Sequence, residues 1–508
     1  MADSDVRRAR VVVVGSGFAG LGMAIRLKEA GVDDFVVLER AGDLGGTWRD
    51  NSYPGCACDV PSHLYSFSFA LNPQWSRSFS PQAEIWSYLR RCAERAGILS
   101  HLRFEHDVTA MRWNQDEVAW DLDTSAGPYR AEIVVSAVGA LSEPRIPEVP
   151  GLERFEGATF HSAAWDHAYD LKGKRVAVVG TGASSIQFVP QIQPDVERLV
   201  LFQRTAPWVL PRRDRDFGAR ERFLYRHVPA LQRLARAGLY WGRELYVLGF
   251  TRNQRMMRMA QWAALRHLRR QVPDPELRAK LTPHYAMGCK RILLANDYYP
   301  ALTQPNVEVR ASGVAEVRPN SVVAADGTEH EVDAIIFGTG FHVTDFPAAQ
   351  YIHGRQGVSL QGAWADGMEG YLGTTVAGFP NLFFLVGPNT GLGHTSMVYM
   401  IESQVAYVLD ALRHMEAAEV AEVEVHPEVQ ARFNDELRAR LDDTVWNTGG
   451  CHSWYLDRHG RNTTLWPGFT FEFRRRTRRF DPARYSLVRR GRHDSTAPSE
   501  LVTAAPPA

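Results

Sequence analysis

The chain has 508 residues, of which 45% are hydrophobic and 23% charged, and its formal net charge is zero. This length is too great for one compact core and predicts at least two domains, and zero net charge argues against bulk attraction to nucleic acid. Apolar runs fall short of the roughly 18 residues that a membrane span needs, and the charged start leads directly into a strand, so we expect a cytoplasmic protein without a secretory signal.

The first predicted element is a dinucleotide-binding unit at residues 8–40. A continuously apolar strand at 11–14 precedes a glycine-rich loop, and residues 21–30 are expected to form the next helix. The loop reads Gly15-Ser16-Gly17-Phe18-Ala19-Gly20. Glycines in this order let the backbone approach a pyrophosphate at the helix N-terminus. Glu39, which ends the apolar run 35–38, is the acid expected to accept hydrogen bonds from a ribose 2′-OH, so this unit predicts an FAD or NAD site.

A second unit of the same kind is predicted at about 172–206. Its loop reads Gly180-Thr181-Gly182-Ala183-Ser184-Ser185, in which a serine replaces the third glycine. Arg204 stands where the first unit has Glu39, and an arginine there suits the 2′-phosphate of NADPH. A chain with both units is built to pass electrons from NADPH to a flavin.

The segment between residues 213 and 285 has helical periodicity and many arginines, and we expect a helical insertion. Its stretch 239–250 can line a substrate entrance or touch a membrane surface, but an amphipathic helix packed on its own domain is the favoured interpretation, and membrane contact is not expected. The strand-like segments 333–341 and 381–387 are expected to return the chain to the first domain. The basic run 474–479 is interpreted as a solvated face or subunit contact.

These features predict an α/β fold with two Rossmann-like dinucleotide-binding domains, for FAD and NADPH, and a helical insertion in the NADPH domain. The expected ranges are 1–148 and 333–490 for the FAD domain, 149–215 and 286–332 for the NADPH domain, 216–285 for the insertion, and 491–508 for a disordered tail. The proline-rich stretch 143–151 is the expected interdomain linker.

The five cysteines are odd in number and scattered, which favours reduced thiols over a disulfide framework. Cys56 and Cys58 are expected to be small packing residues, because C-x-C is not the C-x-x-C spacing of flavin disulfide reductases. No Cys/His cluster completes a zinc site, so no metal is expected.

Two longer motifs make a specific resemblance. Residues 155–166 match the pattern F-x-G-x-x-x-H-x-x-x-W-[P/D] at Phe155, Gly157, His161, Trp165 and Asp166. The pattern [A/G]-G-x-W-x(4)-[F/Y]-P-[G/M]-x(3)-D is matched by Gly45-Gly46-Thr47-Trp48, Tyr53-Pro54-Gly55 and Asp59. Over most of residues 8–470 the chain resembles the type I Baeyer–Villiger monooxygenases, whereas flavin-containing N/S-monooxygenases usually carry Tyr or Phe where Trp165 stands.

The resemblance implies that NADPH reduces FAD, that O₂ then gives a C4a-peroxyflavin, and that this species converts a ketone to an ester or lactone, with sulfoxidation as a side activity. It implies Arg291 of the Lys290-Arg291 pair as the residue that stabilises the negative charge on oxygen, because a guanidinium keeps its charge when partly buried. It also implies that Asp59 orients Arg291, and that Lys290, Arg204 and Thr205 hold the 2′-phosphate.

His161 and Trp165 are interpreted as members of a motif that positions the domains and NADPH, with Phe155, Gly157 and Asp166, and not as acid–base catalysts. Residues 338–341 resemble the segment that closes onto both nucleotides, with Gly338 in place of the usual alanine. His394 and Trp446 are expected to be structural. The residues expected to bind the cofactors are Gly15, Ser16, Gly17, Phe18, Ala19, Gly20, Glu39, Arg40, Gly46, Thr47, Trp48, Asp59, Val60, Tyr65, Val108, Gly180, Thr181, Gly182, Ser184, Ser185, Gln187, Arg204, Thr205, Lys290, Thr339, Gly340 and Asn389.

Two other functions compete with this interpretation. One is a heteroatom oxygenase that oxidises amines or sulfides, which Trp165 and the Lys290-Arg291 pair disfavour. The other is a non-oxygenating NADPH–flavin reductase or a nucleotide-bound regulator, which lacks a use for Arg291. The sequence does not identify the ketone or the oligomeric state.

Overall fold

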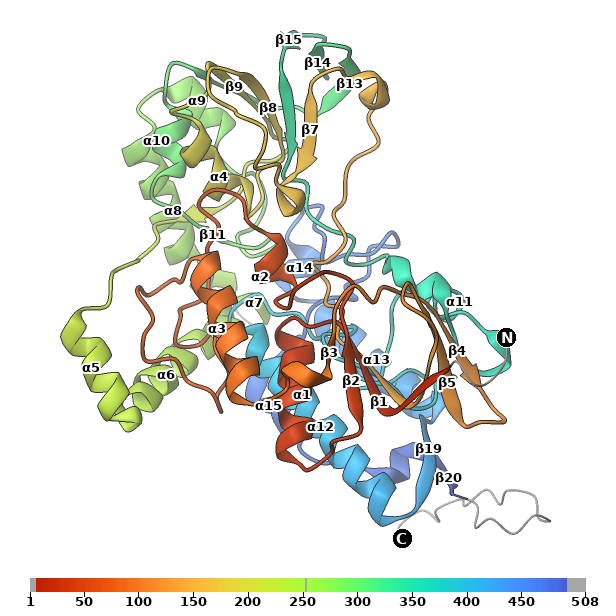
Figure 1. Cartoon of the computed structure of the whole chain (residues 1–508). Helices are drawn as coiled ribbons and strands as arrows, with labels where there is room; N and C mark the ends of the chain where they lie inside the picture. The colour runs from red at the N-terminus through yellow and green to blue at the C-terminus, as the bar shows by residue number, and fades with distance from the viewer. Residues whose placement is uncertain (1–5, 252–253, 491–508) are drawn as a thin grey trace.

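The structure is a computed structural model that describes residues 6–251 and 254–490. The chain forms two α/β units, which lie one above the other in Figure 1 and are joined along several segments. The predicted tail at 491–508 lies outside the described residues. The two sheets confirm the α/β fold with two Rossmann-like units.

The first unit, in the lower part of Figure 1, is built on an eight-stranded sheet in the order β17-β4-β5-β6-β1-β2-β3, with β18 also paired to β6. Its strands are β1 (Arg7–Val14), β2 (Phe35–Leu38), β3 (Leu102–Arg103), β4 (Val108–Asn114), β5 (Ala119–Thr124), β6 (Tyr129–Ser136), β17 (Ile352–His353) and β18 (Leu382–Phe384). β1 lies between β2 and β6, parallel to both, and Val11, Val12 and Val13 are fully buried, as the apolar run predicts.

Helices cover this sheet and complete the first unit. α1 (Phe18–Glu29) begins within the glycine loop, three residues before the predicted start at 21, and Gly17 is its N-cap residue. It packs against α12 (Met397–Ala417). The other elements of this unit are α2 (Thr47–Asp50), α3 (Gln82–Arg95), α11 (Leu360–Ala363), α13 (Pro427–Leu441), α14 (Val445–Thr448), α15 (Thr470–Arg476), β19 (Val420–Val425) and β20 (Tyr485–Arg489).

The second unit is built on a parallel sheet in the order β12-β9-β8-β16-β7. Its strands are β7 (Ala158–His161), β8 (Arg175–Val179), β9 (Arg198–Phe202), β12 (Val307–Arg310) and β16 (Ala334–Phe337), joined by α4 (Ser185–Ile192), α10 (Tyr298–Leu302) and a small antiparallel sheet of β13 (Val314–Arg318), β14 (Ser321–Ala324) and β15 (Glu329–Glu331).

One expected strand lies in the other sheet. The segment around 334–337 was expected to return the chain to the first domain, but β16 pairs with β7 and β8 of the second unit. The chain crosses back after Phe337, and β18 then pairs with β6 of the first unit, as expected for 381–387. The prediction for this strand was wrong because a fully apolar four-residue strand fits the centre of either parallel sheet.

The helical insertion is present between β10 (Val209–Leu210) and β11 (Leu293–Leu294), which pair with each other. Its helices are α5 (Ala219–His227), α6 (Pro229–Glu244), α7 (Tyr246–Thr251), α8 (Met257–Gln271) and α9 (Pro275–Lys280). α5 and α6 form a hairpin that projects from the side of the first unit in Figure 1. Within the described ranges, no helix is both long and apolar enough to cross a membrane.

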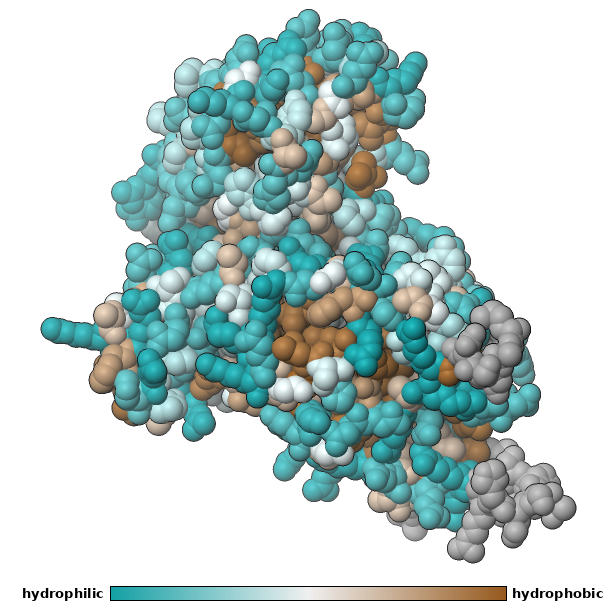
Figure 2. All heavy atoms as spheres, viewed as in Figure 1, coloured by the Kyte–Doolittle hydropathy of each residue, from teal (hydrophilic) through white to brown (hydrophobic). Residues whose placement is uncertain are grey.

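The surface is mostly hydrophilic in Figure 2, with apolar residues gathered in the middle of the viewed face, over the first unit. The basic run 474–479 is partly neutralised within the chain, because Arg474 pairs with Glu402 and Arg476 with Glu436 and Glu472. This pairing agrees with a solvated face.

Candidate active site

The first glycine loop has the close backbone approaches that its sequence predicts. Gly15 has φ +99°, and a Cβ there would lie 2.8 Å from the Ala137 carbonyl oxygen. A Cβ on Gly20 would lie 1.8 Å from the Gly15 carbonyl oxygen, and one on Gly46 would lie 3.1 Å from the Cα of Gly17. Bare backbone at these positions forms a cradle at the N-terminus of α1, which fits the pyrophosphate of a dinucleotide.

Glu39 holds this loop in place. One carboxylate oxygen accepts hydrogen bonds from the backbone N (3.0 Å) and Oγ (2.7 Å) of Ser16, and the other accepts from the backbone N of Ala41 (3.0 Å). Burial alone would raise the pKa of Glu39, but these bonds and the nearby Arg49 lower it below its usual value. Glu39 therefore stays ionised and fixes the loop, besides its predicted role at the ribose.

The other predicted FAD-side residues lie at several places in the first unit. Trp48 of α2 donates from Nε1 to the Tyr65 hydroxyl at 3.1 Å. Arg40 pairs with Glu143 in the predicted linker. Buried Asn389 donates from Nδ2 to the carbonyl oxygens of Asn462 and Leu465, so its amide nitrogen is used within the protein. The remaining members are Phe18 and Ala19 of α1, Thr47 at the start of α2, buried Val60, and Val108 at the start of β4.

The second glycine loop makes its close contact with a different partner. Gly180 has φ +105°, and a Cβ there would lie 2.5 Å from the Gly338 carbonyl oxygen. Ser185, in the third small position, is fully buried, and a Cβ on Gly338 would lie 1.9 Å from the Ser185 Oγ. The two departures from the expected pattern, Ser185 and Gly338, therefore compensate each other. Thr339 and Gly340 follow, and both bond to the backbone of Arg145.

The three residues predicted to hold the 2′-phosphate lie together. The Lys290 Nζ donates to the Thr205 Oγ1 at 2.7 Å, and Thr181 reaches the Thr205 carbonyl oxygen at 3.5 Å. Burial and the charge of Arg204 lower the pKa of Lys290. Among the described residues, no carboxylate lies within 4.0 Å of Arg204 or Lys290. Arg204 is exposed to solvent. Two neighbouring cations without a counter-charge suit a doubly charged phosphate.

Arg291 and Asp59 form the ion pair that the motifs predict, although 232 residues separate them. The Arg291 Nε and Nη2 each donate to a different Asp59 oxygen at 2.6 Å. The Asp59 charge raises the pKa of Arg291 further; burial would raise the pKa of Asp59, but Arg291 lowers it. The side chains of Arg291 and Asp59 remain 30% and 24% exposed, so the pair is partly accessible from solvent. No hydrogen bond to the Arg291 Nη1 is present in the described part of the chain, which leaves this nitrogen available to a ligand.

Two further residues near this pair, both from the end of α6, were not singled out by sequence reasoning, which named only the stretch 239–250 that contains them. Arg243 is largely buried and donates to the His394 carbonyl oxygen at 3.1 Å. Burial lowers the pKa of Arg243, and the charges of Asp59 and Arg291 also act on it, so Arg243 lies near the ion pair. Glu244 is buried and accepts from the Thr470 N and Oγ1. Its Oε1 also lies 3.2 Å from the His394 Nε2. The structural role expected of His394 agrees with this network.

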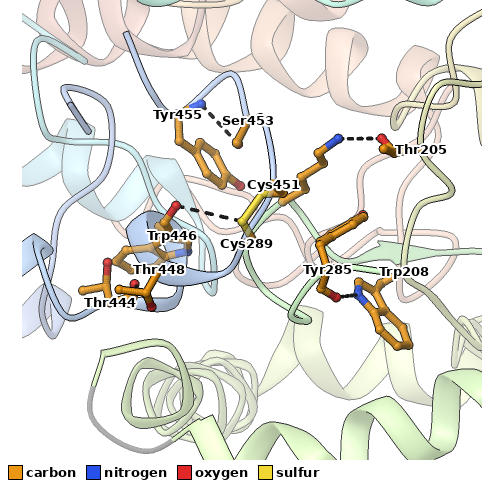
Figure 3. The surroundings of a disulfide bond; sticks show 11 residues. Thr205, Trp208, Tyr285, Cys289, Thr444, Trp446, Thr448, Cys451, Ser453 and Tyr455 are labelled. Carbon is orange, nitrogen blue, oxygen red and sulfur yellow. Dashed lines mark hydrogen bonds between the residues drawn. A yellow bond between two sulfur atoms is a disulfide. The ribbon is translucent and has the colours of Figure 1, made fainter. Parts of the chain in front are cut away.

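A disulfide bond corrects the prediction of reduced thiols. Cys289 and Cys451 are bonded, with their Cα atoms 6.2 Å apart and 162 residues between them, and Figure 3 shows them between Tyr455 and Trp446. The wide spacing gave no sequence signal, because only the fold brings the α14 region against the loop before Lys290. Cys56, Cys58 and Cys92 are buried and free, and burial raises the pKa of Cys56 to about 12, in agreement with packing roles. Because two of the five cysteines form a disulfide, the cysteines no longer support the expected cytoplasmic location.

The positioning motif lies at the edge of the second sheet. His161 ends β7 and accepts a hydrogen bond at Nδ1 from the Ala163 N at 3.1 Å, and burial lowers its pKa to about 4, so the ring is neutral at pH 7. Trp165 packs against Phe160 and Phe188. A Cβ on Gly157 would lie 2.4 Å from the Asp333 carbonyl oxygen. Phe155 packs beneath this sheet, and Asp166 accepts from the Ala168 N.

The two units contact each other through the motif that ends at Asp59. Tyr53 donates to the Gln187 Oε1 at 3.0 Å, and the Gln187 Nε2 donates to the Ala57 carbonyl oxygen at 3.0 Å. A Cβ on Gly55 would lie 2.8 Å from the Gln187 carbonyl oxygen. Ser184 and Gln187 of the α4 region therefore face the first unit. The segment that ends at Asp59, the partner of Arg291, thus also forms a contact between the two units.

Comparisons with known proteins agree with this geometry. The family model described as FMO-like, flavin-binding monooxygenase-like, matches residues 8–351. The chain belongs to this family of flavin-binding monooxygenases.

The similarity to individual proteins is more specific. A Baeyer-Villiger monooxygenase of Streptomyces coelicolor is 56% identical over 482 residues, covering 94% of this chain and 93% of the relative, and one of Pseudomonas aeruginosa is 53% identical over 484 residues, covering 95% and 92%. Cyclohexanone monooxygenase from Rhodococcus sp. Phi1 bound to NADP+ matches with a TM-score of 0.82 at 29% identity, covering 95% of this chain and 99% of that one. Within its family, the chain is a member of the Baeyer–Villiger monooxygenases.

Proposed function

We propose that this protein uses NADPH and O₂ to convert a ketone to an ester or lactone on bound FAD, and that Arg291 is its catalytic arginine. When bound, FAD would carry out the reaction with O₂, and NADPH would supply the electrons that reduce it. The observation that carries the proposal is the Arg291–Asp59 pair, in which the partly exposed Arg291 keeps its Nη1 without a hydrogen bond to the described residues. The relatives named as Baeyer-Villiger monooxygenases and the NADP-bound neighbour support the reaction and the cofactors.

Arg291 is suited to stabilise negative charge on oxygen. Asp59 uses the Nε and Nη2 donors, which fixes the plane of the guanidinium and directs Nη1 away from the carboxylate. A fixed donor loses little entropy when charge develops, so it stabilises that charge more than a mobile one does. Asp59 is therefore a positioning residue, and Arg291 is the catalytic residue.

Arg204, Thr205 and Lys290 select NADPH over NADH in this proposal. They present two cations and a hydroxyl at one place, a set that matches the oxygens of a 2′-phosphate. The reactants are a small ketone and O₂, and we place the protein in the cytoplasm. Occasional sulfoxidation is compatible with the same site.

Replacement of Arg291 by alanine tests the proposal. We expect ester formation to fall by at least about 100-fold, the equivalent of one lost charge-stabilising donor, while NADPH still reduces the flavin and H₂O₂ accumulates. Arg291→Lys keeps the charge but loses the fork to Asp59, so it should recover only a small part of the ester yield. The measurement is ester or lactone by gas chromatography beside NADPH consumption and H₂O₂.

Two outcomes are contrary to the proposal in different ways. Unchanged ester yield in Arg291→Ala would remove Arg291 from the reaction but leave the enzyme class intact. Wild-type protein that oxygenates amines but gives no ester with any ketone of a broad panel would favour the heteroatom oxygenase.

A further inference from the structure

Helix α6 packs against the protein with its polar side. The residues that face inward and form hydrogen bonds with the first unit are Gln232, Arg236, Tyr240, Arg243 and Glu244. Their partners include the carbonyl oxygens of Asn72 and His63 and the backbone of Thr470. The expected amphipathic helix is present, but its orientation is opposite to that of a helix that buries an apolar stripe in its own core.

The outer side of the same helix is apolar. Leu231, Leu234, Trp241 and Leu245 follow one another at intervals of three, seven and four residues, which places them on one face. Leu234 is 70%, Trp241 57% and Leu245 58% exposed. The neighbouring Tyr246 is also exposed, and Phe471 of α15 extends the face because its ring lies 5.8 Å from that of Trp241.

The adjoining helix α5 continues this surface. Phe223 and Leu224 are exposed, and Val228 is exposed at the turn between α5 and α6. We call the exposed apolar residues of α5, the turn and α6, namely Phe223, Leu224, Val228, Leu231, Leu234, Trp241, Leu245 and Tyr246, the hairpin face. A continuous exposed apolar face of this kind marks an interaction site in a folded protein.

The hairpin that carries this face is rich in positive charge. Residues 219–244 contain six arginines and two glutamates, although the whole chain has zero net charge. One glutamate, Glu244, is buried, and the other, Glu221, pairs with Arg215. Arg220, Arg226 and Arg233 are exposed, and no ion pair to any of them is present in the described ranges. The surface is therefore both apolar and cationic.

We propose that the hairpin face docks on an anionic lipid surface. Acyl chains would cover the apolar side chains, and anionic headgroups would neutralise the arginines. A second copy of this chain fits less well, because pairing two hairpin faces would bring like charges together across an apolar contact. The association is peripheral, since a hairpin of this length lies in the interface and does not cross it.

The position of α6 connects this surface with the Arg291–Asp59 pair. Arg243, on the inner side of the helix, lies near Asp59 and Arg291, while Trp241 and Leu245 lie on its outer side. A lipid surface on the hairpin face would thus lie one helix away from the catalytic pair. The docking proposal does not depend on which substrate the enzyme oxidises.

Vesicle co-sedimentation of the FAD-loaded protein tests the proposal. We expect binding to phosphatidylcholine vesicles that contain about one third phosphatidylglycerol, weak binding to pure phosphatidylcholine, and release at about 0.5 M NaCl. The double variant Leu234→Ser/Trp241→Ser should bind at least about tenfold more weakly. Arg226→Glu/Arg233→Glu should lose binding to a similar extent.

Matched controls keep the test specific. Leu99→Ser changes an exposed leucine on the first unit away from the hairpin, and Lys172→Glu reverses an exposed charge on the second unit, so both should bind like the wild type. All variants should keep the bound-flavin spectrum and the activity on a water-soluble ketone. Equal binding by wild type and both hairpin variants, or no binding to anionic vesicles, would overturn the proposal. A wild-type dimer that dissociates in Leu234→Ser/Trp241→Ser by sedimentation velocity would assign the face to a second copy and overturn it too.

Discussion

The two glycine loops of this chain differ in the contacts that fix them. In the first unit the third position must be a glycine, because a Cβ on Gly20 would clash with the Gly15 carbonyl oxygen of the same loop. The acid Glu39 is buried and accepts a hydrogen bond from Ser16 of this loop. In the second unit the third position is Ser185, whose close contact is to Gly338, the residue after β16, and the equivalent of Glu39 is the exposed Arg204.

This difference shows that the third position of the same motif can be constrained by its own loop or by another segment of the chain. In the first loop the third position, Gly20, is constrained by Gly15 of the same loop, although Gly15 itself faces the Ala137 carbonyl oxygen from outside the loop. The second depends on the segment after β16, which lies more than 150 residues away.

Gly20→Ala should have the largest effect. A Cβ 1.8 Å from a backbone oxygen cannot be accommodated by side-chain movement, so we expect a loss of more than about 3 kcal/mol of stability and failure to retain FAD. Ser185→Ala, at the equivalent position of the second loop, should retain FAD and NADPH. Flavin absorbance after gel filtration and thermal unfolding measure both, and equal behaviour of the two variants would show that the loops do not differ in this way.

Arg204→Ala should come next and affect only one cofactor. Loss of a charge-assisted bond to the 2′-phosphate, about 2 kcal/mol, should weaken NADPH by roughly 30-fold and leave NADH unchanged. Stopped-flow flavin reduction at varied coenzyme concentration gives both constants. Equal weakening of the two coenzymes would discard the phosphate assignment.

The Ser185–Gly338 contact predicts a smaller, reciprocal effect. Gly338→Ala places a Cβ 1.9 Å from the Ser185 Oγ and should cost about 1–2 kcal/mol of stability, because a hydroxyl must rotate or shift. Ser185→Gly/Gly338→Ala restores the space and should recover most of that loss, which a double-mutant cycle by urea unfolding detects. Additive losses would mean that the two positions are independent.

The smallest predicted effect is the pH dependence that Glu39 contributes. Its pKa in the folded protein lies below the usual 4.5, so it adds stability above about pH 4.5 that is lost as the pH falls through the folded value. The stability difference between wild type and Glu39→Gln, about 1 kcal/mol at pH 7, should therefore shrink on acidification. The control variant Arg204→Gln should show no such change between pH 4 and 7.

Sequence alone predicted the parts of the site that local patterns encode. Both glycine loops, the Lys290–Thr205 contact and the Arg291–Asp59 pair are present where the motifs place them. The sheet of β16 was assigned wrongly, because a short apolar strand carries no mark of its neighbours. The position of Arg243 near the site could not be predicted, because its helix has the usual amphipathic period. Only the fold shows that the polar side of this helix faces inward.

The Cys289–Cys451 bond gives a practical consequence. It ties the residue just before Lys290 and Arg291 to a segment near the carboxyl end of the described chain, so a reducing agent would sever a covalent tether beside the reaction centre. Enzyme purified with dithiothreitol and enzyme purified without it are thus two chemically distinct preparations. Their yields of ester per NADPH consumed have to be compared side by side.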